Sequence, residues 1–416
     1  MNSRHDVLII GGGPVGLSCA YYLLKSGRSV AVFDAKEIGK GSGSGNAGHI
    51  VPSHIIPLAA PGVVTSALKW MLDPEHSPFG MKVSLNPNYL MWLLKFTAAC
   101  NEVNVTRNVK PLNDLGQLSA KNFAQIIAEE KFDCAYQEKG LLFLYKTEQA
   151  FHDGQHEGEF IQKHGIPVSV YDKPKLHEVE PAALDDVIGG VHFTGDAHLN
   201  PTMFLKLLRE RVQSMGAELM DGTKVTGFEV ANGKIVKIKT SAGDFEAEQV
   251  VLAAGALTPS VAKDLNLNIP VQPARGYSMT MSATKTMPSH ALILGERKVA
   301  VSPMDGLLRF TARLEVGNYS MEPNPLWIRR IENAAREYLR LDEKLDVKET
   351  WAGLRPTTPD GVPIICKSPK HDNLVLVTGH AMLGLSLGPG TGQVVAELVN
   401  GYETAFDLSL LKLERF

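Results

Sequence analysis

The sequence predicts an α/β protein in which a Rossmann-like dinucleotide-binding domain carries an inserted, mainly antiparallel α+β domain. An apolar strand runs directly into a glycine-rich turn, V-L-I-I-G-G-G-P-V-G at 7–16, and a helical segment follows it. A second apolar stretch, 29–33, ends in Asp34. Between about 266 and 349 the pattern changes to longer alternating strands. Strand, glycine turn, helix and a carboxylate on the second strand together indicate a dinucleotide site, although the glycine spacing alone would be weak evidence.

Each residue of this fingerprint has a physical role. The strand is expected to turn tightly at Gly11, Gly13 lets the backbone approach a pyrophosphate, and Gly16 lets the helix pack close to the strand. The helix N-terminus then faces the phosphates, where its free N–H groups favour negative charge. Asp34 can accept a hydrogen bond from a ribose hydroxyl. The sequence therefore predicts a bound dinucleotide.

A helix and a small-residue loop complete this region. The first helix is expected to run from Pro14 to about Ser26, because proline suits a first helical turn and Gly27 suits the end of the helix. The loop 39–49 reads G-K-G-S-G-S-G-N-A-G-H. So small and flexible a segment is either a linker or backbone that wraps a ligand, and its position directly after the second strand favours the ligand.

Turn residues and alternation predict the remaining elements. A helix opened by Asn200-Pro201 and closed by Gly216 is followed by short strands around Val225 with turns at Asn232-Gly233 and Ala242-Gly243, which indicate an antiparallel meander. Further strands are expected at 140–145, 189–193, 250–254, 276–281, 298–302 and 307–314, and a further helix at about 326–339.

The order of these patterns predicts a discontinuous domain organisation, because glycine-rich segments return in the last seventy residues. A chain of 416 residues also exceeds one ordinary core. The dinucleotide-binding domain is expected to comprise 1–88, 176–265 and 350–416, and the substrate-binding domain to comprise 89–175 and 266–349.

Composition and charge limit the class of protein. A net charge of −3 without a basic cluster argues against nucleic acid as a partner. The four cysteines are far apart and lack metal-type pairing, so reduced thiols in the cytoplasm and no metal are expected. No signal peptide and no spanning apolar run are apparent, which also favours a cytoplasmic protein. The apolar segment 89–100 is interpreted as a buried helix, with a peripheral contact to the cell membrane left as the alternative.

Later motifs resemble those of a known family. They are, in chain order, S-G-N-A-G-H at 44–49, A-A-P-G-V at 59–63, R-G-Y-S at 275–278, W-A-G-L-R-P-T-T-P-D-G-V-P-I-I at 351–365, N-L-V-L-V-T-G-H at 373–380 and G-L-S-L-G-P-G-T-G at 384–392. Together with the N-terminal fingerprint they resemble the FAD-dependent D-amino-acid oxidase superfamily, and within it the small-subunit-type D-amino-acid dehydrogenases of bacteria. The resemblance covers essentially the whole chain. Glycine and sarcosine oxidases share the G-L-R-P and G-H elements but match less well elsewhere.

The resemblance implies FAD, bound by a Rossmann-like domain of glutathione-reductase type. A cysteine that tethers the flavin in related sarcosine oxidases lies near the position of Gly353 and is missing here, so non-covalent FAD is expected. The cofactor-binding residues implied by the resemblance are Gly11, Gly13, Pro14, Val15, Gly16, Asp34, Ala35, Ser44, Asn46, Ala47, Gly48, Val225, Ala254, Gly255, Gly384, Gly388, Gly390 and Thr391.

Arg355, inside G-L-R-P, matches the family's carboxylate-binding arginine. A planar guanidinium is the group best suited to hold a carboxylate with two parallel hydrogen bonds, although most arginines form surface ion pairs. Tyr277 could add a phenolic hydrogen bond or could simply pack in the core. His380 could tune the flavin or relay a proton, or could be structural. His49 is a weaker candidate for substrate contact.

Three further side chains bear on the substrate. Arg309 and Arg313 lie on an alternating strand and are expected to be solvated or paired. Met382 occupies a place where some glycine-oxidising relatives carry a second basic residue. An apolar residue there hints at substrates with an apolar side chain or ring.

The expected reaction is oxidative deamination of a D-amino acid, D-proline-like rings included, by hydride transfer from Cα to flavin N5. Electrons would then pass to a quinone or another respiratory acceptor. One alternative is a glycine- or sarcosine-type oxidase that uses oxygen. Another is an FAD-binding subunit of a larger electron-transfer complex. A nicotinamide enzyme is disfavoured, since the C-terminal motifs would have no role in it.

Overall fold

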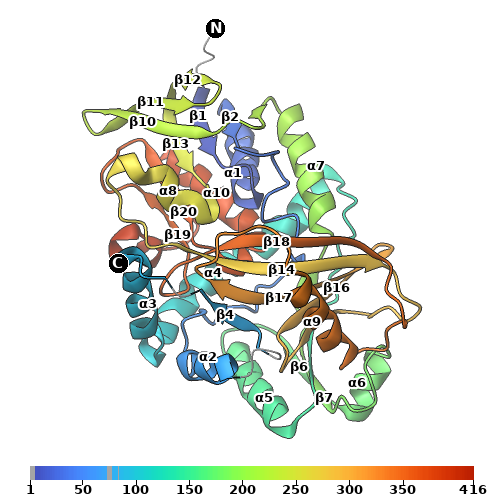
Figure 1. Ribbon diagram of the computed structural model, residues 1–416. Coiled ribbons are helices and arrows are strands. Elements are labelled where there is room, and N and C mark those ends of the chain that lie inside the picture. The colour runs from blue at the N-terminus through green and yellow to red at the C-terminus, as the bar shows by residue number, and fades with distance from the viewer. Residues whose placement is uncertain (1–4, 73–76, 83) are drawn as a thin grey trace.

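The computed structural model describes residues 5–72, 77–82 and 84–416, and these form two large sheets, a three-stranded and a two-stranded sheet, with helices around them (Figure 1). The first sheet has the strand order β19-β20-β13-β1-β2-β9, parallel except for β19. Its strands are β1 (His5–Ile10), β2 (Val30–Phe33), β9 (Glu218–Met220), β13 (Ala247–Leu252), β19 (Ile364–Lys367) and β20 (Leu374–Thr378). The predicted α/β class is confirmed.

Helices cover one face of this sheet and a meander covers the other. Val7 and Ile9 of β1 face a core formed with four helices, whereas Leu8 and Ile10 face the meander, because side chains alternate along a strand. The helices are α1 (Pro14–Lys25), α4 (Glu102–Glu130), α7 (Pro201–Ser214) and α10 (Gly388–Asn400), and the meander strands are β10 (Val225–Ala231), β11 (Lys234–Thr240) and β12 (Gly243–Phe245). The expected first helix, the 201–215 helix and the meander are confirmed.

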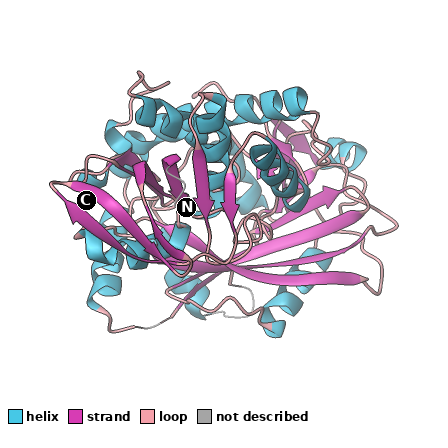
Figure 2. Ribbon diagram, turned by 90° about the horizontal axis from the view of Figure 1, so that it is seen from above, coloured by secondary structure: helices cyan, strands magenta, loops and turns pink. Residues whose placement is uncertain are grey.

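The second sheet has nine strands, mostly antiparallel, in the order β18-β14-β17-β16-β15-β5-β7-β6, with β4 beside β17. Figure 2 shows its long strands extending as a layer across the molecule. Its strands are β4 (Phe79–Met81), β5 (Leu141–Tyr145), β6 (Val168–Asp172), β7 (Gly189–Phe193), β14 (Gln272–Ser282), β15 (Ala291–Leu294), β16 (Val299–Met304), β17 (Leu307–Val316) and β18 (Val347–Thr357). The strands expected between 276 and 314 are confirmed.

Shorter elements connect the two sheets. The remaining helices are α2 (Val63–Leu72), α3 (Pro87–Ala99), α5 (Glu148–Gln162), α6 (Lys173–Val179), α8 (Thr258–Val261) and α9 (Pro325–Arg336), with 3-10 turns η1 (Gly255–Leu257), η2 (Ala262–Leu265), η3 (Ala381–Leu383), η4 (Ser409–Leu411) and η5 (Leu413–Arg415). The short strands β3 (His49–Ile50) and β8 (Ala197–His198) pair with each other. Helix α9 fulfils the prediction of a helix near 326–339.

Sheet membership does not follow the predicted domain boundaries. Strands β4, β7 and β18 belong to the nine-stranded sheet, although they lie wholly or mostly in segments assigned to dinucleotide binding. Helix α4 comes from a segment assigned to substrate binding, yet it packs in the core of the six-stranded sheet. The boundaries themselves stay a prediction.

Helix α3 is buried on one face only, so the interpretation of 89–100 as a wholly buried helix is incomplete. Tyr89 and Trp92 are buried and pack with neighbours on the nine-stranded sheet. Leu90, Met91 and Leu94 are exposed, Leu94 by 66%. In the part of the chain that the structure describes, no helix is long and apolar enough to cross a membrane.

Candidate active site

The predicted cofactor residues gather at one edge of the six-stranded sheet. Gly11 and Asp34 directly follow β1 and β2. Ala254 lies two residues after the end of β13, and His380, predicted as a catalytic residue, lies two residues after the end of β20. All four strands are parallel, so their carboxyl ends meet at this edge. Ligands of open α/β sheets bind outside the carboxyl ends of the strands. The fold therefore places the fingerprint where a dinucleotide binds.

The glycine turn has the geometry that a dinucleotide requires. Gly11 has a φ of +111°, and a Cβ there would lie 2.4 Å from the Ala253 carbonyl oxygen. A Cβ on Gly16 would lie 1.8 Å from the Gly11 carbonyl oxygen, so no larger residue fits. Gly13 caps α1 without a side-chain hydrogen bond, and the space beside its Cα is open. The helix N–H groups thus face an open position, as phosphate binding needs.

The Asp34 carboxylate is fixed by two backbone hydrogen bonds. It accepts from the Gly12 N–H at 2.8 Å and from the Lys36 N–H at 2.9 Å. An ionised carboxylate has about four acceptor positions, so two remain for a ribose hydroxyl. The turn and the carboxylate are therefore connected directly, and this arrangement fits an adenosine ribose beside the pyrophosphate.

The late glycine-rich segment packs one helix against its neighbours. A Cβ on Gly392 would lie 2.5 Å from the backbone of Ser18, and one on Gly390 would lie 3.0 Å from the Leu115 carbonyl oxygen. These glycines therefore let α10 approach α1 and α4 closely. Helix α10 begins at Gly388, and its first N–H groups are already bonded, since Gly388 donates to the Leu385 carbonyl oxygen at 2.9 Å and Gly390 to the Ser119 Oγ at 3.1 Å.

His380 and Thr391 are brought together. The His380 Nε2 lies 3.0 Å from the Thr391 Oγ1, and both side chains are buried. Burial lowers the pKa of His380 to about 4, so its imidazole is neutral at neutral pH. A neutral, hydrogen-bonded ring favours the structural alternative for His380 over a proton relay.

Arg309 is buried, and it holds the loop that the resemblance places beside the flavin. Its side chain is 3% exposed, and Nη1 donates to the carbonyl oxygens of Ser44 at 2.7 Å and Asn46 at 2.9 Å. Of the two expected environments, solvated or paired, the structure shows the second, since Nη2 forms an ion pair with Glu349 at 3.5 Å. Strand alternation gave no signal that this arginine meets a distant loop.

His49 is the last residue of the same loop and the first of β3. Its Nε2 is 2.9 Å from the Ser302 Oγ, and its strand β3 pairs with His198. Burial lowers the pKa of His49 to about 3, so the ring is neutral. The structure gives His49 a partner in the nine-stranded sheet, and nothing in this geometry supports contact with substrate.

Arg355 is a half-buried cation without a counter-charge among the described residues. It lies opposite Ala274, and its guanidinium covers Gly276, where a Cβ would lie 2.4 Å from the Arg355 Cζ. It donates to the Arg313 carbonyl oxygen, and burial lowers its pKa to about 10. Among the described residues, no carboxylate forms an ion pair with it. A guanidinium that is partly shielded from water favours an opposite charge, so this position suits an anionic ligand.

Tyr277 faces away from Arg355. It pairs with Ala352, whereas Arg355 pairs with Ala274, so the two side chains lie on opposite faces of the sheet. The Tyr277 hydroxyl donates to the Glu315 Oε2 at 3.1 Å and accepts from Arg275. The structure therefore does not bring Tyr277 to the Arg355 guanidinium, and its ring packs in a core. Residues 275 and 277 alternate with residue 276 along the strand. This alternation was the sequence signal that Tyr277 lies on the face opposite to that of Gly276.

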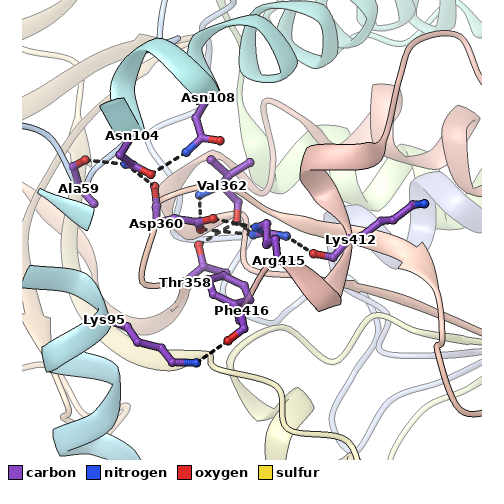
Figure 3. Close-up of polar contacts among 10 residues, drawn as sticks. All are labelled: Ala59, Lys95, Asn104, Asn108, Thr358, Asp360, Val362, Lys412, Arg415 and Phe416. Atoms are coloured by element: carbon purple, nitrogen blue, oxygen red, sulfur yellow. Dashed lines mark hydrogen bonds and ion pairs between the residues drawn. The ribbon is translucent and has the colours of Figure 1, made fainter. Parts of the chain in front are cut away.

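The C-terminal residues anchor the turn that follows Arg355 (Figure 3). The Arg415 guanidinium pairs with Asp360 at 2.7 Å and donates to the Val362 carbonyl oxygen at 2.7 Å. Lys95 donates to the Phe416 oxygen at 3.0 Å. These contacts fix the T-P-D-G turn, and sequence reasoning missed them because they join the tail to distant segments.

The structure also bears on the expectations about metal, the cysteines and the last cofactor residues. Within 5–72, 77–82 and 84–416, no group of three metal-binding side chains is present. The four cysteines are free, and burial raises the pKa of Cys134 to about 12, so this thiol is unreactive. Val225 begins the meander, and Gly255, with a φ of +54°, accepts from the Thr378 hydroxyl at 2.9 Å.

Similarity to known proteins agrees with this geometry. The model of the DAO family, described as FAD dependent oxidoreductase, matches residues 6–398. A D-amino acid dehydrogenase of Vibrio atlanticus is 30% identical over 423 residues, which cover 99% of this chain and all of the relative. A D-amino acid dehydrogenase of Paramagnetospirillum magneticum is 31% identical, with 99% of this chain and 98% of the relative covered. The crystal structure of glycine oxidase from Geobacillus kaustophilus superposes with a TM-score of 0.82 at 24% identity, with both chains covered completely.

The fold and the dinucleotide edge define an FAD-binding oxidoreductase. The chain belongs to the DAO family of FAD-dependent oxidoreductases, and FAD is its cofactor. The expected family, fold class and cofactor are confirmed. The likeness to glycine oxidase concerns the fold, because the identity is below 25%.

Proposed function

We propose that this protein oxidises D-amino acids with FAD and releases the corresponding imino acids. The observation that carries the proposal is the Arg355 guanidinium, which is half-buried and has no carboxylate partner among the described residues. The two relatives of about 30% identity, named D-amino acid dehydrogenase, support a D-amino acid as the source of that carboxylate.

The chain's own residues orient the substrate and hold the cofactor in this proposal. Arg355 holds the substrate carboxylate by a bidentate contact. Gly11 and Gly13 let backbone approach the FAD pyrophosphate, Asp34 accepts from the adenosine ribose, and Arg309 fixes the loop beside the flavin. FAD, when bound, accepts the hydride of the substrate Cα. The remaining proposed cofactor contacts are Pro14, Val15, Gly16, Ala35, Ser44, Asn46, Ala47, Gly48, Val225, Ala254, Gly255, Gly384, Gly388, Gly390 and Thr391.

Anaerobic reduction of the flavin tests the proposal. Titration with D-alanine and D-proline is expected to bleach the visible flavin band, while L-alanine and L-proline leave it unchanged. Arg355→Met is expected to weaken apparent amino-acid affinity by roughly 100-fold or more, since a charge-assisted bidentate contact is lost, with flavin content unchanged. Arg340→Met is the matched control, because Arg340 is exposed and pairs with Asp185. Unchanged affinity in Arg355→Met would exclude the carboxylate contact.

We infer further that FAD is bound without a covalent link. Gly353 stands where the resemblance places a tethering cysteine, and its nearest side chain is the ring of Trp351. Acid precipitation is expected to leave all of the flavin in the supernatant. Flavin that stays with the precipitated protein would contradict this.

We propose that electrons pass to a quinone at a membrane surface. The exposed Leu90, Met91 and Leu94 on α3 support a peripheral contact, because exposed apolar side chains on one helix favour an apolar partner. Turnover with D-alanine is expected to be faster with a short-chain ubiquinone than with oxygen. Leu90→Ser/Leu94→Ser is expected to reduce co-flotation with liposomes. Peroxide formation at the full rate in air would instead favour the oxidase alternative.

A further inference from the structure

Two buried hydroxyl groups lie opposite each other on neighbouring strands. Ser278 of β14 is in register with Thr311 of β17, and their residues are 0% and 7% exposed. Across the ranges that the structure describes, neither the Ser278 Oγ nor the Thr311 Oγ1 has a hydrogen-bond partner. Buried hydroxyls normally have partners, since leaving one unpaired costs free energy. Two such groups side by side point to a ligand.

The Ser278–Thr311 pair lies between Arg355 and Arg309. Gly276, Ser278 and Thr280 point to one face of β14, because side chains alternate along a strand. The Arg355 guanidinium covers Gly276. Thr280 accepts from the Nε of Arg309, the residue that holds the loop 39–49. The hydroxyl of Ser278 therefore lies between the carboxylate-binding guanidinium and the anchor of that loop.

The spacing fits the amino group of an amino acid. Two residues along a strand span about 7 Å, which separates the Ser278 position from Gly276 and the guanidinium above it. An α-amino acid carries its amine one carbon away from its carboxylate, so a carboxylate on Arg355 leaves the amine within reach of the next residue pair. Each hydroxyl can accept an N–H hydrogen, and each can also donate.

We propose that Ser278 and Thr311 form an amine-binding subsite. Their hydroxyl oxygens accept N–H hydrogens from the substrate's amino group while Arg355 holds its carboxylate. This inference rests on the proposed function, since it presupposes an amino-acid carboxylate on Arg355. The subsite explains two unpaired polar atoms that packing alone leaves unsatisfied, and it makes the site selective for amino acids over simple carboxylic acids.

Two unreactive ligands of equal shape test the subsite. 2-Aminoisobutyrate has a carboxylate and an amine but no Cα hydrogen, and pivalate replaces the amine by a methyl group. Binding to the FAD-loaded protein is measured by calorimetry. The wild type is expected to bind 2-aminoisobutyrate at least about tenfold more tightly than pivalate, since a net hydrogen bond is worth roughly 3- to 12-fold in affinity.

Substitutions of Ser278 and Thr311 then test whether these two residues cause the preference for 2-aminoisobutyrate over pivalate. Ser278→Ala and Thr311→Val are each expected to reduce the preference about three- to tenfold, and the double variant to abolish it. Pivalate affinity and FAD content should change by less than about twofold. Ser282→Ala, on the same strand but bonded to Asp346, is the matched control and should keep the full preference.

The outcomes separate the subsite from the proposed function. Equal binding of both ligands by the wild type, or an undiminished preference in the double variant, overturns the subsite and leaves the Arg355 contact standing. Binding of neither ligand by the wild type overturns both. Loss of FAD from the double variant shows that the hydroxyls serve the cofactor, which also overturns the subsite.

Discussion

Replacing Arg309 by methionine tests whether its buried guanidinium fixes the loop 39–49, which the resemblance places beside the flavin. Methionine keeps much of the side-chain volume but removes the two hydrogen bonds to the carbonyl oxygens of Ser44 and Asn46. The ion pair with Glu349 is longer, at 3.5 Å, and its carboxylate is half exposed, so its loss matters little. The expected effect therefore comes from the two carbonyl groups.

The structure sets the size of that effect. The Asn46 carbonyl is left without a donor, which costs about 1–3 kcal/mol, whereas the Ser44 carbonyl still accepts from the Thr202 hydroxyl at 3.2 Å. The loop has other anchors, because the Ser42 Oγ accepts from the Leu354 N–H at 3.2 Å and the Asn46 side chain donates to the Met382 carbonyl at 3.1 Å. The loop therefore shifts without detaching, and the lower end of the range applies. A loss of about 1–2 kcal/mol corresponds to roughly 5- to 30-fold weaker FAD binding.

The assay is a fluorescence titration of the apo-protein with FAD, in which bound flavin is quenched. Arg340→Met serves as the control for removing an arginine, because its guanidinium is exposed. A folded Arg309→Met variant that binds FAD as tightly as the wild type would refute the reasoning. It would show that the other anchors suffice to hold the loop.

Three further predictions follow from other contacts. Gly276→Ala places a Cβ 2.4 Å from the Arg355 Cζ, so KM for amino acids should rise on the order of 10- to 100-fold with flavin content unchanged, as steady-state kinetics would show. Arg415→Ala leaves the partly buried Asp360 unpaired and should lower the free energy of unfolding by about 3 kcal/mol in a urea titration; no change would mean the tail is dispensable. Burial raises the pKa of Asp196 from 3.8 to about 8, so the stability from its bound proton is complete below pH 3.8 and is lost as pH rises through 8. Asp196→Asn should therefore flatten the fall in unfolding free energy between about pH 4 and 8, and parallel pH profiles of the two proteins would contradict this assignment.

Local features of the chain were predictable because their causes are local. Pro14 and the turn Asn232-Gly233 placed α1 and the meander correctly, since both depend on backbone preferences of the residues themselves. The fingerprint at 7–16 located the cofactor edge for the same reason. The C-terminal motif singled out Arg355, because the residue types around it are specific.

Tertiary contacts were not predictable from one sequence. Nothing in the alternation of β17 shows that Arg309 reaches a loop 265 residues away. The pairing of Ser278 with Thr311 depends on the register of two strands, and a bulge shifts that register beside Tyr277. The role of these residues becomes visible only when the strands are placed beside one another.

The order of strands in the six-stranded sheet has a consequence for how the protein is made. The ribosome completes β1 and β2 first, but β1 needs β13 as its other neighbour, and β13 needs β20. Helix α10, which packs against α1, is synthesised later still. The edges of the nascent N-terminal strands therefore remain unpaired for most of translation. Such edges can pair with other chains and aggregate, and they can be bound by chaperones. A premature stop before β20 would yield a chain that retains the complete fingerprint and still lacks β20 and α10.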